Sequence, residues 1–211
     1  MFAGHEGVQL WESGPYWATA NIGAENPWDY GCYFWWGGTV GYRRMGSKWA
    51  AGDGSSSNFS FDGSNMPTLR RNIMLKIGGW LTLLGGVLAP RHDAAHTQWG
   101  CGWRMPTKRE FEDLESKCDW TWTKVKNVQG YVVRGRGDYA SARIFLPSAG
   151  FGGRTSLHDA GSRGYYWSSI PSSDSYYEAY VLEFNSESHS TSDFYYRYSG
   201  QSVRPVQGFT E

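Results

Sequence analysis

The clearest periodic segment of the chain is PTKREFEDLESKC. Its apolar residues recur at i, i+3 and i+7, so they share one face of a helix: Phe111, Leu114 and Cys118. Thr107 and Glu110 have the T-x-x-E spacing of a capping box at its start. The pattern therefore predicts one clear helix over about residues 107–118, with one buried face.

Outside this segment, apolar and polar residues alternate over short stretches, which is typical of strands separated by turns. DWTWT alternates directly after the helix, and GYVVRG and ARIFLPSAG flank the turn-rich RGRGDYAS. Towards the C-terminus we expect strands that include Gly164–Ser169, Ala179–Asn185 and Gln201–Gln207. Residues 8–45 alternate aromatic residues with Gly, Asn and Pro, which also predicts short strands. Mostly short antiparallel strands, long loops and low helix content define an α+β fold class.

Three further segments complete the pattern. Residues 93–96, DAAH, leave open a second short helix, and the polar, Gly/Ser-rich residues 46–68 predict a long surface loop. The apolar run IMLKIGGWLTLLGGVLAP contains Lys76, two Gly-Gly pairs and Pro90, so it is too interrupted to span a bilayer. We expect it to be core or a packing surface. The start, MFAGHEGVQLW, lacks the basic and apolar regions of a signal peptide.

Length and composition fit one domain over residues 1–211. Lys+Arg and Asp+Glu are 20 each, so no net charge favours nucleic acid or an anionic membrane as partner. The three cysteines, Cys32, Cys101 and Cys118, are an odd number, so at least one is unpaired and the redox compartment stays open. Twelve Trp, 14 Tyr and 28 Gly favour an irregular, loop-rich fold filled by large rings.

Residues 165–199 have an unusual composition. They contain ten Ser and eight Tyr, and Lys is absent from there to the C-terminus. Antibody-like contact surfaces share this composition, because Tyr supplies rigid contact area at low entropic cost and Ser supplies adaptable hydrogen bonds. An exposed, Ser/Tyr-rich edge strand with solvated loops is an equally good interpretation of composition alone.

The irregular residues also follow a codon rule. Asn codons changed at random at their adenines yield Tyr, Ser, Asp, His, Phe, Val, Gly or Arg, among others, but never Lys, Glu, Gln, Met or Trp. Most irregular residues of the C-terminal third belong to the permitted set, whereas Glu178, Glu183 and Glu187 do not.

The regular residues between them carry a resemblance. WATANIGAENPWDYGCYFWWG, WGCGWRMPTKREFEDLESKCDWTWT, GYVVRG, IFLPSAGF, GYYWSS and GQSVRPVQGF resemble bacterial and phage domains of the C-type lectin fold. These domains are related to the formylglycine-generating-enzyme type of that fold. The final third resembles the variable proteins of diversity-generating retroelements, in which adenine-specific errors are copied into the 3′ end of the gene. The resemblance implies a C-type lectin fold with a diversified ligand-binding region over about residues 150–206.

The resemblance also assigns roles to residues. A constant framework is implied for Trp99, Trp103, Arg104, Pro106, Trp167, Ser168, Ser169, Arg197, Gly200, Ser202, Val203, Arg204, Pro205 and Val206. A ligand-binding role is implied for His158, Asp159, Arg163, Tyr165, Asp174, Ser175, Tyr176, Tyr177, Tyr180, Val181, Ser188, Ser190, Ser192, Asp193, Phe194, Tyr195, Tyr196, Tyr198 and Ser199. We expect these side chains to be exposed and grouped on one face. Cys101 and Cys32 depart from the family pattern, which usually has a small and an acidic residue there, and a disulfide between them stays open.

The expected function is binding of a protein or glycan target on a cell surface, from a phage tail or a bacterial cell surface. Nucleic-acid binding and membrane insertion are not expected, and a homo-oligomer through the IMLKIGGWLTLL region would add avidity. The alternative is a structural subunit of a phage tail or cell-surface appendage, with the Tyr/Ser face packed on a neighbour.

Catalysis is not expected. A formylglycine-generating-type enzyme, the remote alternative, needs reactive cysteines near the end of the domain, and no Cys follows Cys118. The Glu-Pro-Asn, Gln-Pro-Asp and Trp-Asn-Asp tripeptides of calcium-dependent sugar binding are missing. No cofactor is therefore expected, although a structural calcium stays open at Asp53, Asp62, Asp93 or Asp138.

Two smaller motifs have simpler interpretations. His92 and His96 are four apart, as in a helical zinc pair, but no third ligand is evident, so polar residues at a helix start are preferred. Arg136-Gly137-Asp138 matches the adhesion tripeptide RGD, for which we prefer a turn between two strands. The basic residues Arg70, Arg71 and Lys76 are read as a solvated face.

Overall fold

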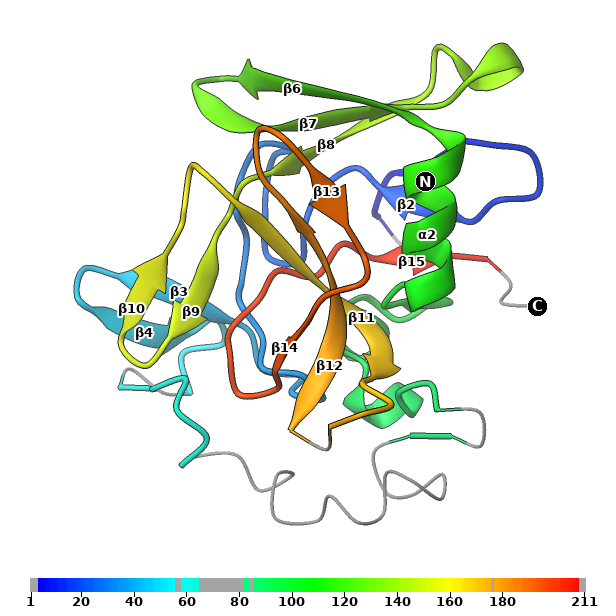
Figure 1. The fold of residues 1–211 in the computed structure, drawn as a ribbon. Helices are drawn as coiled ribbons and strands as arrows, with labels where there is room; N and C mark the ends of the chain where they lie inside the picture. Colours follow the sequence, from blue (N-terminus) through cyan, green and yellow to red (C-terminus); the bar gives the residue numbers. More distant parts are fainter. Residues whose placement is uncertain (1–3, 56–57, 65–81, 84–85, 176, 209–211) are drawn as a thin grey trace.

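The computed structural model describes residues 4–55, 58–64, 82–83, 86–175 and 177–208. Within them the fold is rich in short strands and has two α-helices, α1 (Ala94–Trp99) and α2 (Lys108–Lys117), as Figure 1 shows. Single 3₁₀ turns lie at η2 (Pro90–His92) and η3 (Gly137–Tyr139). The predicted α+β class with low helix content is confirmed.

Helix α2 forms as its sequence predicts. The Thr107 side chain accepts a hydrogen bond from the Glu110 N–H at 3.2 Å, and the Glu110 carboxylate accepts one from the Thr107 N–H at 2.8 Å. The same carboxylate pairs with the Arg104 guanidinium at 2.5 Å. The buried face consists of the predicted residues Phe111, Leu114 and Cys118.

Helix α1 is the second short helix that the sequence left open. Asp93 caps it by accepting from the His96 N–H at 3.0 Å, and also accepts from the Met105 N–H at 2.8 Å. His92 belongs to η2, and Asp93 is extended between the two turns. The two histidines therefore do not share a helix face, and the spacing argument for a zinc pair fails.

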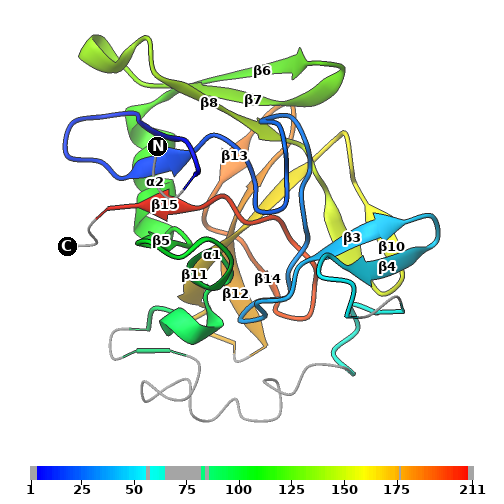
Figure 2. The same cartoon turned by 180° about the vertical axis from the view of Figure 1, so that it is seen from behind.

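The strands after α2 form an antiparallel three-stranded sheet: β6 (Asp119–Val125), β7 (Val128–Arg134) and β8 (Arg143–Pro147). These are the strands predicted from DWTWT, GYVVRG and ARIFLPSAG. A second sheet has the order β1 (Gly7–Gln9), β2 (Tyr16–Ala18), β15 (Val206–Gln207), β5 (Trp103–Arg104), so strands from both ends of the chain pair (Figure 2).

Two sequence predictions are wrong in this part of the fold. The closing strand expected over Gln201–Gln207 is reduced to β15, because Gln201 and Ser202 instead make single bridges to Phe34 and Tyr166. The expected loop over residues 46–68 contains β4 (Lys48–Ala51), which pairs with β3 (Tyr42–Met45). Its Trp49, Phe59 and Phe61 are buried with Tyr33 and Tyr42, because isolated rings among Gly and Ser can still fill a core. The IMLKIGGWLTLL run lies almost wholly outside the described residues.

The predicted ligand-binding residues lie on two sheets. One has β9 (Phe151–Gly153) and β10 (Ser156–His158); the other has β11 (Gly164–Pro171), β12 (Glu178–Phe184), β13 (His189–Ser190) and β14 (Phe194–Tyr196). Both β13 and β14 pair with β12. β11 and β12 cover the range of the expected strands Gly164–Ser169 and Ala179–Asn185 to within a residue or two.

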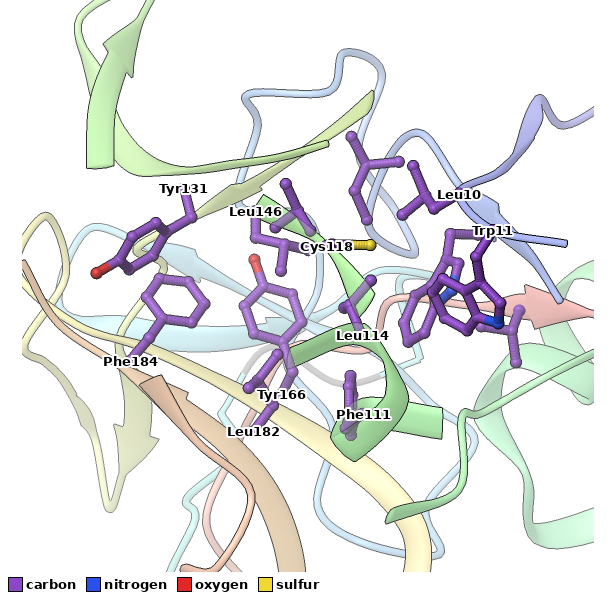
Figure 3. Close-up of a cluster of buried hydrophobic side chains, with 14 residues drawn as sticks. Leu10, Trp11, Phe111, Leu114, Cys118, Tyr131, Leu146, Tyr166, Leu182 and Phe184 are labelled. Carbon is purple, nitrogen blue, oxygen red and sulfur yellow. The ribbon is translucent and has the colours of Figure 1, made fainter. Parts of the chain in front are cut away.

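Core packing fixes the β11–β12 sheet from both sides. On one side, Tyr166, Leu182 and Phe184 pack with α2 through Phe111 and Leu114 (Figure 3). On the other side, buried rings and aliphatic chains from distant segments form a second cluster around Trp167: Phe34, Trp36, Met105, Val181 and Val203. The Trp167 indole N–H donates to the Phe34 carbonyl at 2.7 Å. The β11–β12 pair is therefore a rigid support for β14, which pairs with β12.

Candidate ligand-binding face

Exposed rings gather on the C-terminal strands. Six large hydrophobic side chains are exposed among the described residues, and three of them come from the predicted ligand-binding set. Tyr177 is 58% exposed, Phe194 41% and Tyr196 50%. An exposed cluster of this kind marks an interaction site more often than scattered single residues do.

Strand register places the rings together. In the β12–β14 pair, Tyr180 is opposite Phe194, and Glu178 is opposite Tyr196. Opposed residues share a face of a sheet, as do residues two apart on one strand, so these four side chains lie on one side. The Tyr180 and Phe194 rings meet edge to face at 6.2 Å.

The ring of Tyr198 extends this surface, since it stacks on Tyr196 with centroids 5.1 Å apart. Tyr177 directly precedes β12, and its carbonyl accepts from the Arg197 N–H at 2.8 Å. We call the rings of Tyr180, Phe194, Tyr196 and Tyr198, together with the exposed ring of Tyr177 next to them in the chain, the aromatic face. In Figure 1, β12 and β14 run side by side at the front of the molecule.

Polar groups surround the aromatic face. The Ser173 hydroxyl lies 3.3 Å from the Tyr180 hydroxyl and donates to the Asp174 carboxylate at 3.0 Å. The buried Ser172 hydroxyl accepts from the N–H groups of Asp174 and Ser175, which shapes the loop. Lys108, at the start of α2, holds its ammonium 4.3 Å from the centroid of the Tyr180 ring. This combination offers ring faces, hydroxyls and carboxylates to a partner.

Three residues of the predicted set are buried, so their expected exposure is wrong: Tyr165 (1% exposed), Val181 (0%) and Ser199 (5%). Val181 and Tyr165 point to the side of the sheet opposite Tyr180, where Val181 packs with Trp167. The codon rule describes which residues a mutated position can hold, and it carries no information on burial.

Tyr195 also departs from the expected single face. Side chains alternate along a strand, so Tyr195 lies on the opposite side of β14 from Phe194 and Tyr196. There it is half-buried, packs against the cluster around Trp167, and meets the Tyr165 ring at 5.0 Å. Desolvation by burial raises the pKa of the Tyr195 hydroxyl, and more strongly that of Tyr165.

A second group of predicted residues surrounds Tyr165. His158 stacks on Phe151 at 5.1 Å, and Phe151 meets Tyr165 edge to face at 5.3 Å. The Tyr165 hydroxyl donates to the Asp159 carboxylate at 3.0 Å, and Arg163 pairs with Glu183 at 2.6 Å. The exposed members of this group are His158, Asp159 and Arg163, and the Tyr165 ring that they surround lies on the side of the sheet opposite Tyr180.

The Ser-rich hairpin between β12 and β14 holds the remaining predicted residues. Ser188 and Ser192 are exposed, and the Ser190 hydroxyl lies 2.6 Å from that of Ser192. Two residues of this hairpin, His189 and Thr191, hold it against the body of the protein. His189 stacks on Trp120 at 4.3 Å, and Thr191 donates to the Glu115 carboxylate of α2 at 2.8 Å. Asp193 is exposed beside the hairpin, and Tyr176 lies outside the described residues.

Arg197 supports the aromatic face from behind. It is 2% exposed, its guanidinium lies 4.6 Å from the Trp36 ring centroid, and its Nε–H donates to the Glu178 carbonyl at 3.0 Å. Desolvation lowers the pKa of this guanidinium to about 10. A buried cation held by a ring and a carbonyl joins the end of β14 to the start of β12.

Sequence reasoning missed Lys108, Ser173, Glu115 and Trp120, which contact or hold the predicted residues. They lie in framework segments or outside the irregular set. Lys108, Glu115 and Trp120 reach this surface only because α2 and β6 pack beside β12. Spacing along the chain could therefore not reveal them.

Other candidate sites have simple structural roles. Within the described parts of the chain, no three His, Cys, Asp or Glu residues are grouped as a metal site would require. Asp53 and Asp62 accept from the N–H groups of Ser55 and Ser64, as turn residues do. Arg136 of the RGD sequence is held by Asp119 at 2.7 Å and by the carbonyls of Ser116 and Cys118 at the end of α2.

The three cysteines are free thiols, so the disulfide left open between Cys32 and Cys101 is not formed. Cys32 is buried and lines a cleft of about 230 Å³, where it accepts from the Arg43 Nε–H at 3.4 Å. Burial raises the pKa of the Cys118 thiol to about 12. The described helices include none with the length and apolar character needed to cross a membrane.

A family model described as "Domain of unknown function (DUF8237)" matches residues 101–206. The chain belongs to this family. The DUF8237 region covers about half of the chain, begins just before β5, and contains every residue of the aromatic face. It leaves out β1 to β4 and α1, and also Phe34 and Trp36, which lie between β2 and β3 and pack in the cluster around Trp167. Neither the curated proteins nor the solved structures contain a match to the chain.

Proposed function

We propose that this protein is a diversified ligand-binding domain that displays the aromatic face to a macromolecular target and carries out no catalysis. In this proposal the fold is a C-type lectin fold, and the irregular C-terminal residues vary by retroelement-driven adenine mutagenesis. In this proposal the domain works on a phage tail or on a bacterial cell surface. The observation that carries the proposal is the grouping of exposed rings on β12 and β14, directly above a sheet packed from both sides.

The exposed rings and the buried residues that hold their strands in place are different sets of side chains. Tyr177, Phe194 and Tyr196 are exposed, so changing them removes few contacts within the domain. The residues that hold β12 and β14, such as Trp167, Leu182 and Arg197, are buried and belong to regular sequence. A surface built this way tolerates exchange of its side chains while its backbone stays in place. Buried Tyr165, Val181 and Ser199 are excluded from the proposed contact set.

A selection experiment tests the binding role. Random short peptides displayed on beads are selected against the wild-type domain and against the variant Tyr177→Ala/Phe194→Ala/Tyr196→Ala. We expect face-dependent enrichment: peptides enriched on the wild type lose about tenfold or more in affinity for the variant, because exposed rings act as anchors. The matched control is Tyr16→Ala, which removes an exposed ring from β2. Equal binding by wild type and triple variant would exclude the aromatic face as the contact surface.

A genomic observation tests the diversification. The gene should lie beside a reverse-transcriptase gene and a near-copy of its own 3′ end that differs at adenines. The differing codons should include those for Tyr177, Phe194 and Tyr196. A near-copy that differs evenly at all four bases would contradict the retroelement mechanism and leave the binding role standing.

The exposed rings also suit the alternative of a structural subunit. In that case the aromatic face would be covered permanently by a neighbouring copy. Gel filtration and cross-linking separate the two functions. A monomer, or an oligomer whose cross-links avoid the aromatic face, favours ligand binding; an obligate oligomer that the triple variant dissociates favours the structural role.

A further inference from the structure

Most of the aromatic face comes from a segment whose charge is unlike that of the rest of the chain. Residues 164–196, which hold every ring of the aromatic face except Tyr198, contain no Lys or Arg and five acidic residues, whereas the whole chain is balanced at 20 of each sign. The segment therefore carries a formal charge of −5 with its one histidine neutral. The five are Asp174, Glu178, Glu183, Glu187 and Asp193.

The neighbouring cations neutralise this charge only in part, although the charge of the exposed Arg154 acts on Tyr198 of the aromatic face. Arg163 pairs with Glu183 at 2.6 Å, which makes Glu183 the only one of the five in an ion pair within the described residues. Arg197 is buried against Trp36. Lys108 lies 3.5 Å from its own helical partner, Glu112. Asp174 and Asp193 are exposed, and Glu178 faces Tyr196 across the strand pair.

The aromatic face already binds a cation within the protein. The Lys108 ammonium lies 4.3 Å from the Tyr180 ring centroid, in the geometry of a cation–π contact. The Tyr196 ring is opposite Glu178, and the Tyr180 hydroxyl is linked through Ser173 to Asp174, so these two rings can offer a cation–π contact together with an ion pair. Ring faces flanked by carboxylates suit Lys and Arg side chains best, because both interactions strengthen as a partner excludes water.

We propose that the aromatic face takes a protein partner that presents Lys or Arg side chains. This inference rests on the proposed function and names the chemical class of its ligand. Phosphate backbones and anionic glycans would meet repulsion from the carboxylates. A neutral glycan would desolvate those carboxylates without offering charge in return, so it is the less favourable occupant.

The peptide selection described above tests the inference through the composition of the enriched peptides. We expect Lys and Arg to be enriched, and binding of the leading peptide to weaken as salt rises. The variant Asp174→Asn/Glu178→Gln should bind that peptide with roughly fivefold lower affinity, as expected for the loss of two partly exposed charge contacts. The control Glu12→Gln/Asp138→Asn removes the same charge from distant exposed sites and should change affinity less than about twofold.

The outcomes distinguish the inference from the function on which it rests. Face-dependent enrichment of neutral or acidic peptides would overturn the basic partner and leave ligand binding intact. Face-dependent binding of a neutral oligosaccharide array, without enrichment of basic peptides, would do the same. Enrichment that ignores the aromatic-face variant would overturn both. Equal melting temperatures of the two charge variants would show that the loss of affinity arises at the surface.

Discussion

At the scale of single residues, position on a strand decides the role of chemically identical side chains. Tyr195 and Tyr196 are adjacent, yet one packs beside Tyr165 and Trp167 while the other is 50% exposed. The backbone alternation of β14 sends them to opposite sides of the sheet. Within β14, the side of the strand on which a Tyr lies therefore decides whether its ring is packed or exposed.

This difference gives a matched pair of variants. Tyr195→Ala should lower the free energy of unfolding by about 2 kcal/mol, because it removes a half-buried ring from a packed cluster. Tyr196→Ala should change it by less than about 0.5 kcal/mol, because its ring is half exposed. Urea unfolding of both variants measures the difference. Equal losses would mean that the aromatic face belongs to the core.

At the scale of elements, α2 links the framework to the aromatic face. Its buried side packs on Tyr166 and Leu182, its first residue Lys108 touches Tyr180, and Glu115 holds the hairpin through Thr191. The helix therefore carries both support and a contact group. Its start is fixed by the capping box, in which Thr107 and Glu110 satisfy each other's backbone N–H.

The cap can be tested alone. Thr107→Ala should destabilise the protein by about 1 kcal/mol, because it leaves the Glu110 N–H without its side-chain acceptor. Thr107→Ser keeps the hydroxyl and serves as the control, with little expected change. Thermal unfolding followed by circular dichroism measures both. If Thr107→Ala left the unfolding temperature unchanged, tertiary packing alone would hold the start of the helix.

At the scale of the whole molecule, buried polar groups tie distant segments together. Arg204 is fully buried and donates to Asn21 and to the carbonyls of Ala18 and Phe145, each at 2.9 Å. Tyr166 is buried in the same region and donates to the Pro147 carbonyl at 2.8 Å. These bonds join residues from the N-terminal, middle and C-terminal parts of the chain, so their loss is felt globally.

The buried tyrosines predict sensitivity to alkali. Burial raises the pKa of Tyr166 from 10.0 to about 12, so the unfolded chain releases this proton at lower pH than the folded protein does. The stability that Tyr166 contributes is complete below about pH 10 and is lost as the pH rises to about 12, an effect of about 2–3 kcal/mol. Burial also raises the pKa of Tyr33 and of Tyr165, so the stability that these two tyrosines contribute is likewise lost as the pH rises.

Urea unfolding across this alkaline range measures the effect. The stability of wild type relative to Tyr166→Phe should fall as the pH rises from about 10 to about 12, because only wild type carries this raised pKa. The comparison cancels the opposite effect of the buried Arg197, whose lowered pKa is present in both proteins. A stability difference between the two proteins that stays constant or rises over this range would contradict the burial of the Tyr166 hydroxyl.

The sequence by itself determined the elements whose signals are local. The capping box and the i, i+3, i+7 spacing predicted α2, and alternation predicted β6, β7, β11 and β12, because helix starts and strand faces depend on near neighbours in the chain. Composition left residues 165–199 open between a contact surface and a solvated edge strand, and the resemblance favoured the contact surface. Tertiary structure alone decided which of those residues are exposed: Val181 packs against Trp167, and Tyr195 lies on the inner side of β14. It also placed the Lys108 ammonium over the Tyr180 ring. It also showed Trp49 and Phe61 as core in a segment expected to be a loop. Burial and pairing between distant segments depend on which surfaces meet, and no local pattern encodes that.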